Sequence, residues 1–209
     1  GASGDVAGYE DEYYQGRRPG GIYVPNFQYE PKRGKKNYLR GYALAGGAYR
    51  EGWQQNASKK GFGAEFKQQV TQAGKWRFGL YAQGEMLPRY ENTVQLHDTL
   101  KDKWGIPQLE INCRWSDNEL DMMKDAADTA EEMLKTAGVV NQGPPGLAIH
   151  ELGTARMGHD PKTSVLNRFN QSHDVANLFV TDGASFSSSA VQNPSLTFMA
   201  LTARAVDYA

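Results

Sequence analysis

Apolar and polar residues alternate along much of the chain with a period of two, which predicts half-buried strands. The segments that show this alternation are 76–87, 89–97 and 107–115. It is strictest in the last of them, where polar residues separate Leu109, Ile111, Cys113 and Trp115. Such alternation is typical of an antiparallel sheet with one face in water. A short extended segment is also expected within 21–29.

Three other segments carry helical signals. The clearest helix follows Ser116, where Glu119 three residues later predicts a capping box, and Gly138 marks its end. A shorter helix is expected at 64–73. In the helix that follows Ser116, the apolar stripe is expected at Leu120, Met123, Ala127, Ala130 and Leu134.

A last helix is predicted at 194–207, because Asn193 is a good N-cap and Pro194 suits the first helical position. The residues of this helix expected to face a core are Leu196, Met199, Ala200 and Ala203. Before it, the short apolar run at 178–180 is typical of a buried parallel strand. The turn-rich segment 140–146 separates this region from the rest, so the pattern predicts an α+β protein with a linker there.

Composition and charge exclude several classes of function. The 209 residues include 23 Lys and Arg against 24 Asp and Glu, so no basic excess favours nucleic-acid binding. No apolar run approaches the ~18 residues expected of a membrane span. Cys113 is the single cysteine, which excludes an intrachain disulfide and a cysteine-based zinc site.

Standard catalytic motifs are incomplete in this sequence. The segment His150-Glu-Leu-Gly-Thr begins like a zinc-protease helix, but Thr154 stands where the second histidine belongs. The glycine-rich dinucleotide-binding motif does not occur. We therefore expect no metal site and no dinucleotide-binding turn within this chain.

Two residues remain as candidates for chemistry. His150 precedes a Gly-Thr pair and could accept a proton near neutral pH. Asn193 precedes a helix N-terminus, which favours negative charge nearby. Together they suit a reaction in which a proton leaves a substrate while negative charge builds on a cofactor. An ordinary structural histidine and a plain N-cap are the alternative interpretation.

The C-terminal motifs carry a family resemblance. They are HELGTARMG at 150–158, DGASF at 182–186 and NPSLTFMALTARAVD at 193–207. Their order and spacing resemble the C-terminal signature of the glucose–methanol–choline (GMC) oxidoreductases. The segments YYQGRRPGGIYVPNF, LRGYALAGGAYREGW and GEMLPRYENTVQL are similar to the substrate-domain half of bacterial members of the gluconate dehydrogenase large-subunit type.

The resemblance implies an FAD-dependent enzyme that oxidises the CH–OH group of an alcohol or sugar. His150 would take the hydroxyl proton while a hydride passes to flavin N5, and Asn193 would hydrogen-bond the substrate oxygen. Asp182 and Gly183 match the segment that runs beside the FAD. Pro194 starts the helix aimed at the flavin pyrimidine ring, where a helix N-terminus favours the charge of reduced flavin.

The resemblance also implies that a substrate-binding domain spans 1–146. Residues 147–209 would then supply the C-terminal strand and helix of an FAD-binding α/β domain whose N-terminal half is absent. We therefore expect the isolated chain to bind FAD weakly or not at all and to have no turnover. Expected partners are a small-molecule alcohol or sugar, the missing FAD-binding half and an electron-transfer subunit. Without a targeting segment, the bacterial cytoplasm and the periplasm both remain open.

A second hypothesis is a non-catalytic module that binds a carbohydrate or a partner protein, because aromatic side chains suit the faces of sugar rings. The candidates are Tyr38, Tyr42, Tyr49, Trp53, Trp76 and Tyr81. Packing within a core and a sheet is the simpler interpretation of these residues. The presence of His150 and Asn193 favours the enzyme, since a module that only binds needs neither.

Overall fold

The computed structural model describes residues 1–7, 21–28, 34, 36–50, 57–59, 61–72, 74–139 and 150–209. Trp53, the predicted linker at 140–146 and the expected boundary at 146/147 lie outside these residues. The backbone divides into two compact units. One comprises Gly1–Lys36, Gly41–Gln83 and Asp121–Leu147, and the other comprises Asn37–Arg40, Gly84–Leu120 and Ala148–Ala209. No helix in the described part of the chain has the length and apolar character needed to cross a membrane.

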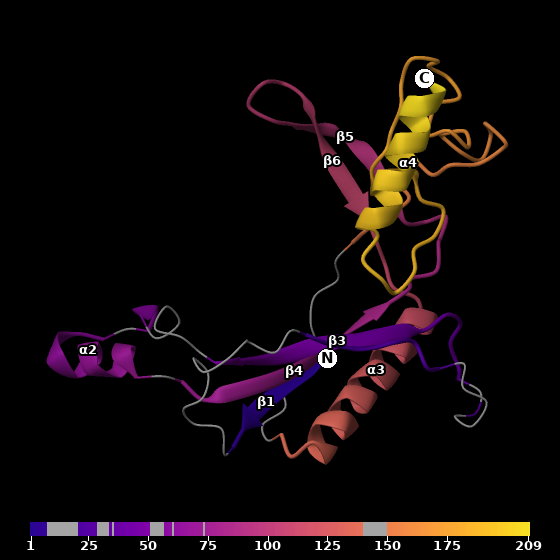
Figure 1. Ribbon diagram of the computed structural model, residues 1–209. Helices are drawn as coiled ribbons and strands as arrows, with labels where there is room; N and C mark the ends of the chain where they lie inside the picture. Colours follow the sequence, from indigo (N-terminus) through magenta and orange to yellow (C-terminus); the bar gives the residue numbers. More distant parts are fainter. Residues whose placement is uncertain are drawn as a thin grey trace. The chain divides into compact units, whose positions relative to one another are not determined.

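A four-stranded sheet forms the centre of the first unit (Figure 1). Its described strands are β1 (Ala2–Val6), β2 (Ile22–Val24), β3 (Tyr42–Arg50) and β4 (Trp76–Gly84), in the order β1-β4-β3-β2. β1 pairs antiparallel with β4, and β2 pairs antiparallel with β3. A Cβ at Gly46 would overlap the Gly79 carbonyl oxygen on the adjacent strand, so glycine permits this close approach. The predicted antiparallel, α+β character is confirmed.

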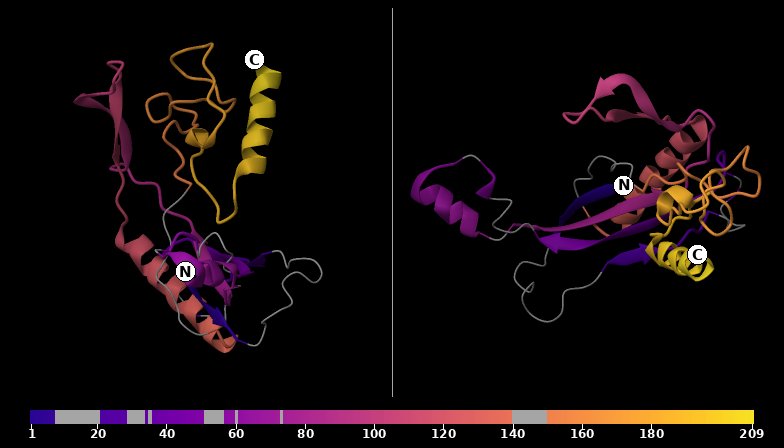
Figure 2. Two further views of the ribbon diagram at one scale, coloured as in Figure 1. Left: turned by 90° about the vertical axis from the view of Figure 1, so that its left-hand side faces the viewer. Right: turned by 90° about the horizontal axis from the view of Figure 1, so that it is seen from above.

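Helix α3 (Asp117–Thr136) packs its later turns along one face of this sheet (Figures 1 and 2). The Tyr42 hydroxyl on β3 donates to Asp125 Oδ2 at 2.9 Å and lies 2.9 Å from Thr129 Oγ1. Lys36 forms an ion pair of 2.7 Å with Asp125 Oδ1. Burial raises the pKa of the Tyr42 phenol, so the hydroxyl stays protonated and remains a donor. A buried polar network therefore joins the helix to the sheet.

The predicted apolar stripe of α3 is correct in its second half and wrong in its first. Ala130 and Leu134 are fully buried, as expected, whereas Leu120 and Met123 are exposed. The buried stripe begins instead at Glu119 and continues through Met122 and Ala126. The buried face of α3 includes Glu119, since its carboxylate is held inside the protein at the start of the helix.

Glu119 forms the predicted capping interaction and extends it. Its Oε2 accepts the Ser116 N–H at 2.8 Å and the Ser116 hydroxyl, while Oε1 accepts the Leu87 N–H at 3.1 Å. The Asn118 amide also donates to it at 3.2 Å. Burial alone would raise the pKa of Glu119, but the hydrogen bonds from Ser116, Leu87 and Asn118 hold it below the ordinary value. At the other end, Gly138 with φ 77° supplies the predicted helix stop.

The other helix predicted in this half is α2 (Gly63–Thr71), which forms close to the expected 64–73. It has no buried residue, and Phe62 before it is 96% exposed.

The second unit contains a two-stranded hairpin of β5 (Thr93–Lys101) and β6 (Pro107–Asn112). Val94 lies opposite Ile111, and Leu96 lies opposite Leu109, so these four side chains share one face. β6 lies within the predicted 107–115, whereas β5 begins and ends four residues later than the predicted 89–97. All of β6 is exposed, and Leu109 and Ile111 are 66% and 68% exposed. No described residue therefore covers the apolar face of the predicted sheet.

Residues 150–186 form turns and single bridges, and α4 (Ser195–Tyr208) follows them. The expected buried parallel strand at 178–180 is wrong: Phe179 makes one antiparallel bridge to Gln171, and Leu178 is 48% exposed. No parallel neighbour lies beside this run among the described residues, so the apolar pattern has no sheet to join.

The face of α4 expected to be buried is also wrong. Leu196 and Met199 are 79% and 68% exposed, and Ala200 and Ala203 are exposed as well. The side that packs carries Phe198 and Ala205, and the Phe198 ring meets the Phe186 ring edge-on at 5.0 Å. The helix is apolar on both sides, so its sequence alone could not indicate which side is covered here.

We predict that Glu119→Gln destabilises the protein by about 1 kcal/mol at neutral pH, because the carboxylate satisfies several donors at the helix start. The pKa of Glu119 is lower in the folded than in the unfolded protein. Its contribution is therefore complete above the unfolded pKa and is lost as the pH falls through the folded pKa. Urea unfolding from neutral to acid pH should show a weaker acid destabilisation in the variant than in the parent.

Glu131→Gln, on the exposed side of the same helix, is the matched control and should leave both stability and its pH dependence unchanged. Equal stability of Glu119→Gln and the parent at neutral pH would contradict the role given to this carboxylate.

Candidate active site

A cavity of about 520 Å³ in the second unit brings the predicted site residues together. Its lining includes His150, Asp182, Gly183, Asn193 and Pro194. The cavity lining comes from three segments of the sequence, at 150–154, 182–184 and 193–198. All five residues singled out from the sequence therefore border one space.

Backbone hydrogen bonds hold the first two of these segments side by side. The Gly153 N–H donates to the Gly183 carbonyl at 3.0 Å, and the Ala155 N–H donates to the Ala184 carbonyl at 2.8 Å. The Met157 N–H continues the series to the Ser185 carbonyl at 2.9 Å. Gly153 has φ 90°, and a Cβ there would lie 2.9 Å from the Phe186 carbonyl oxygen. Glycine is needed at this position because the ladder starts in a left-handed conformation.

His150 lies three residues before Gly153, the first donor of this series of backbone hydrogen bonds, and it is exposed. Its φ of 66° is uncommon for a residue with a side chain. Strained conformations of this kind cluster at functional sites. The His150 segment is not helical, which agrees with rejecting the zinc-protease motif from its sequence. An exposed imidazole on a cavity wall can accept or donate a proton to a bound molecule.

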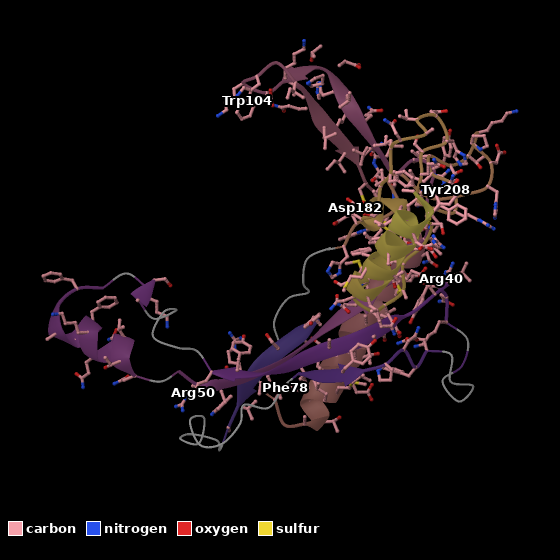
Figure 3. All side chains as sticks on the ribbon, turned by 45° about the horizontal axis from the view of Figure 1, so that its top comes forward. Arg40, Arg50, Phe78, Trp104, Asp182 and Tyr208 are labelled. Atoms are coloured by element: carbon pink, nitrogen blue, oxygen red, sulfur yellow. The ribbon has the colours of Figure 1, made fainter. Side chains whose placement is uncertain are left out.

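Asp182 and Gly183 form the start of a short 3₁₀ turn, η2 (Gly183–Ser185). The Asp182 carboxylate accepts the Ala184 N–H at 2.9 Å, and the Ser185 hydroxyl donates to the Asp182 carbonyl at 2.8 Å. Gly183 is buried, and a Cβ there would overlap the Leu152 side chain. Asp182 appears beside α4 in Figure 3. The turn thus presents a fixed carboxylate on the cavity wall.

The third segment carries Asn193 and the start of α4. The N-cap is Pro194 rather than the expected Asn193, because the Pro194 carbonyl accepts the Phe198 N–H at 3.1 Å. Pro194 itself makes no side-chain capping hydrogen bond. The N–H groups of Ser195, Leu196 and Thr197 therefore have no partner within the helix, and all three residues are exposed. The positive end of the helix dipole thus opens onto the cavity that Ser195 lines.

Sequence reasoning missed other residues of the cavity lining. These are Glu151, Leu152, Thr154, Ala184, Ser195 and Phe198. Each is adjacent to, or within a few positions of, a residue that was identified, so the motifs themselves contained the signal. Phe198 follows from the helical spacing, because it lies one turn after Pro194 and faces the Phe186 ring.

Ser164 and His173 form another contact that could suggest chemistry, with Ser164 Oγ 3.1 Å from His173 Nε2. The Ser164 hydroxyl donates to the Asp160 carbonyl at 2.7 Å, so its proton is directed away from the imidazole. This arrangement stabilises the turn at 160–164 and does not activate a nucleophile.

Comparison with known proteins places this geometry in a family. A family model described as GMC oxidoreductase matches residues 88–202. The 2-methyl-1,2-propanediol dehydrogenase of Mycolicibacterium austroafricanum is 37% identical over 132 residues, which cover 60% of this chain and 24% of that protein. The fructose dehydrogenase large subunit of Gluconobacter japonicus is 33% identical over 134 residues, covering 61% of this chain and 24% of that subunit.

The gluconate 2-dehydrogenase flavoprotein of Pantoea cypripedii is 28% identical over 153 residues, covering 68% of this chain and 25% of that protein. The chain thus spans about a quarter of the length of these relatives. The family model covers more than half of the chain and includes the cavity residues from His150 to Phe198. The resemblance read from the C-terminal motifs is confirmed, and the chain belongs to the GMC oxidoreductase family.

Proposed function

We propose that this chain supplies the proton-transfer side of the active site in an FAD-dependent oxidoreductase that oxidises the CH–OH group of an alcohol or sugar. The observation that carries the proposal is the single cavity that joins His150, Asp182 and Asn193 to the N-terminus of α4. Membership of a family that is generally FAD-dependent supports the choice of cofactor.

The residues of the cavity fit a flavin in their chemistry. Reduction places negative charge on the flavin ring, and the N–H groups of Ser195, Leu196 and Thr197 would stabilise such a charge. Asp182, Gly183 and Pro194 would border the ring. When bound, FAD accepts the hydride from the substrate carbon.

The residues of this chain would handle the proton. One nitrogen of the His150 imidazole takes the hydroxyl proton as the C–H bond breaks and the C=O bond forms. The Asn193 amide would donate a hydrogen bond to the substrate oxygen and hold it near His150. The exposed position of His150 lets the proton pass on to solvent afterwards.

We further propose that other parts of a longer protein complete this site. The chain has no glycine-rich dinucleotide motif, and the exposed faces of α4 and of the β5–β6 hairpin support the idea of a covering partner. The isolated 209 residues would then bind FAD weakly or not at all and would not turn over. An electron-transfer subunit is a further proposed partner.

We predict that His150→Ala, in the complete flavoprotein that contains this chain, slows flavin reduction by about 10²–10⁴-fold while FAD remains bound. Anaerobic stopped-flow absorbance with a range of sugars and alcohols measures the rate, and the absorbance spectrum measures the bound flavin. His159→Ala is the matched control, since His159 is exposed and does not line the cavity. Flavin reduction by His150→Ala at the parental rate would disprove the assignment of the base.

A specific observation also favours the second candidate function, carbohydrate binding by the sheet of the first unit. Tyr23, Tyr49 and Tyr81 are 47%, 45% and 50% exposed. Strand alternation places Tyr23 and Tyr49 on the face opposite to the buried Tyr42 side, and Tyr81 opposite to buried Leu80. Exposed aromatic rings on a sheet suit the faces of sugars.

The other candidates for sugar binding differ in burial. Tyr38 and Tyr42 are buried, as the simpler packing interpretation expected, and Trp76 is half-buried.

If the sheet binds sugars, Tyr49→Ala and Tyr81→Ala should each weaken the binding of D-fructose by about tenfold, because each removes one stacking face. Nuclear magnetic resonance titration of the protein measures this affinity. Tyr90→Ala is the control, because Tyr90 is 91% exposed and lies outside the sheet strands. An equal loss for all three variants, or no sugar-dependent shift in the parent, would exclude this function.

A further inference from the structure

Asn170 is a fully buried polar residue that forms two hydrogen bonds with the backbone of Val180, just before Asp182. Its side-chain amide donates to the Val180 carbonyl at 2.9 Å, and its own carbonyl accepts the Val180 N–H at 3.0 Å. Its N–H donates to the Asn167 carbonyl at 3.1 Å. A single residue therefore satisfies both backbone groups of Val180, two positions before the carboxylate on the cavity wall.

The conformation of Asn170 restricts which residue can do this. Its φ is 63°, in the left-handed region that asparagine tolerates better than most residues. Its side chain also has to provide a donor toward Val180 and an acceptor on the other side. Glycine would fit the backbone and lose the side-chain donor, whereas most other side chains would strain the backbone.

The side-chain oxygen of Asn170, Oδ1, faces helix α4. Arg204 Nη2 lies 3.4 Å from Asn170 Oδ1 and 3.7 Å from Met157 Sδ. Two residues earlier in α4, Thr202 Oγ1 lies 2.8 Å from the Phe198 carbonyl oxygen and 3.4 Å from the Thr181 carbonyl oxygen. Arg204 on α4 therefore contacts both Met157 of the 150–158 segment and Asn170, and Asn170 holds the segment that leads to Asp182.

We propose that Asn170 and Arg204 are positioning residues that set the distance between Asp182 and the N-terminus of α4. This inference rests on the proposed function, in which these two features border the flavin. The Asn170–Val180 bonds fix the segment that carries Asp182, and Arg204 fixes the helix whose first residues line the same cavity. Errors of about 1 Å in such geometry reduce reaction rates by large factors, so a link of this kind matters for catalysis.

Arg204→Met tests the link, because it removes the guanidinium and leaves the buried Asn170–Val180 bonds in place. In the complete flavoprotein, we expect Arg204→Met to weaken FAD binding and to slow flavin reduction, each by about tenfold. The dissociation constant for FAD, measured by fluorescence after removal of the flavin, gives a readout that does not depend on activity. Thermal unfolding of the flavin-free protein should stay close to that of the parent.

Arg168→Met is the matched control, since Arg168 belongs to the same region and stacks on Phe169 without joining this network. Arg204→Lys, which keeps a donor on α4, should recover part of the FAD affinity. Asn170→Asp is the second variant: it keeps the acceptor for Arg204 but places an oxygen against the Val180 carbonyl, and it should also weaken FAD binding.

The outcomes separate the two proposals. If the parent binds FAD and depends on His150, and Arg204→Met and Arg168→Met both match the parent within twofold, the positioning role is wrong and the proposed function stands. If the parent neither binds FAD nor depends on His150, the proposed function and this inference both fail. Weaker FAD binding in Arg204→Met and Asn170→Asp, but not in Arg168→Met, supports the inference.

Discussion

The short series of backbone hydrogen bonds from Gly153, Ala155 and Met157 to the 183–185 turn is the constraint on which the site depends. It joins two segments about thirty residues apart in sequence and places His150 and Asp182 on one cavity. The series can form because Gly153 adopts φ 90° and Gly183 leaves room for Leu152. Backbone bonds of this kind depend little on side-chain identity, so they provide a stable frame for a few chemically specific residues.

The two ends of α4 contribute differently to that frame. Its N-terminus lines the cavity through Ser195, and its last turns carry Arg204, near Asn170, and Tyr208, labelled in Figure 3, whose ring stacks on Phe169 with centroids 3.9 Å apart. One side of the helix is packed and the other side exposes Leu196, Met199 and Val206. A helix that is apolar on two sides is suited to burial between two layers, and the described residues cover one side of α4.

Local chemistry explains which parts of the fold could be predicted from the sequence. The start of α3 was predictable because Ser116 and Glu119 interact within one turn, and its end because Gly138 adopts a left-handed conformation. The buried faces of α3 and α4 were harder to predict, since both depend on what lies against the helix. Glu119 shifted the register of α3, and the run at 178–180 had no neighbouring strand to pair with.

The sequence motifs located residues that lie beside one cavity, while their catalytic roles stay predictions. His150, Asp182, Gly183, Asn193 and Pro194 line one cavity, and backbone hydrogen bonds between segments about thirty residues apart bring the first two motifs together. The capping role of Asn193 was misplaced by one residue, since the Pro194 carbonyl begins the helix. Asn170 gave no sequence signal, because its importance comes from Val180 and Arg204, which are ten and thirty-four positions away.

The proposed function requires these residues to border a flavin. The most direct measurement is the flavin content of the native polypeptide that contains this sequence, isolated from its natural source and denatured to release bound cofactor. We expect a yellow protein with about one FAD per polypeptide, bleached by an alcohol or sugar under anaerobic conditions. A colourless protein that releases no flavin would contradict it.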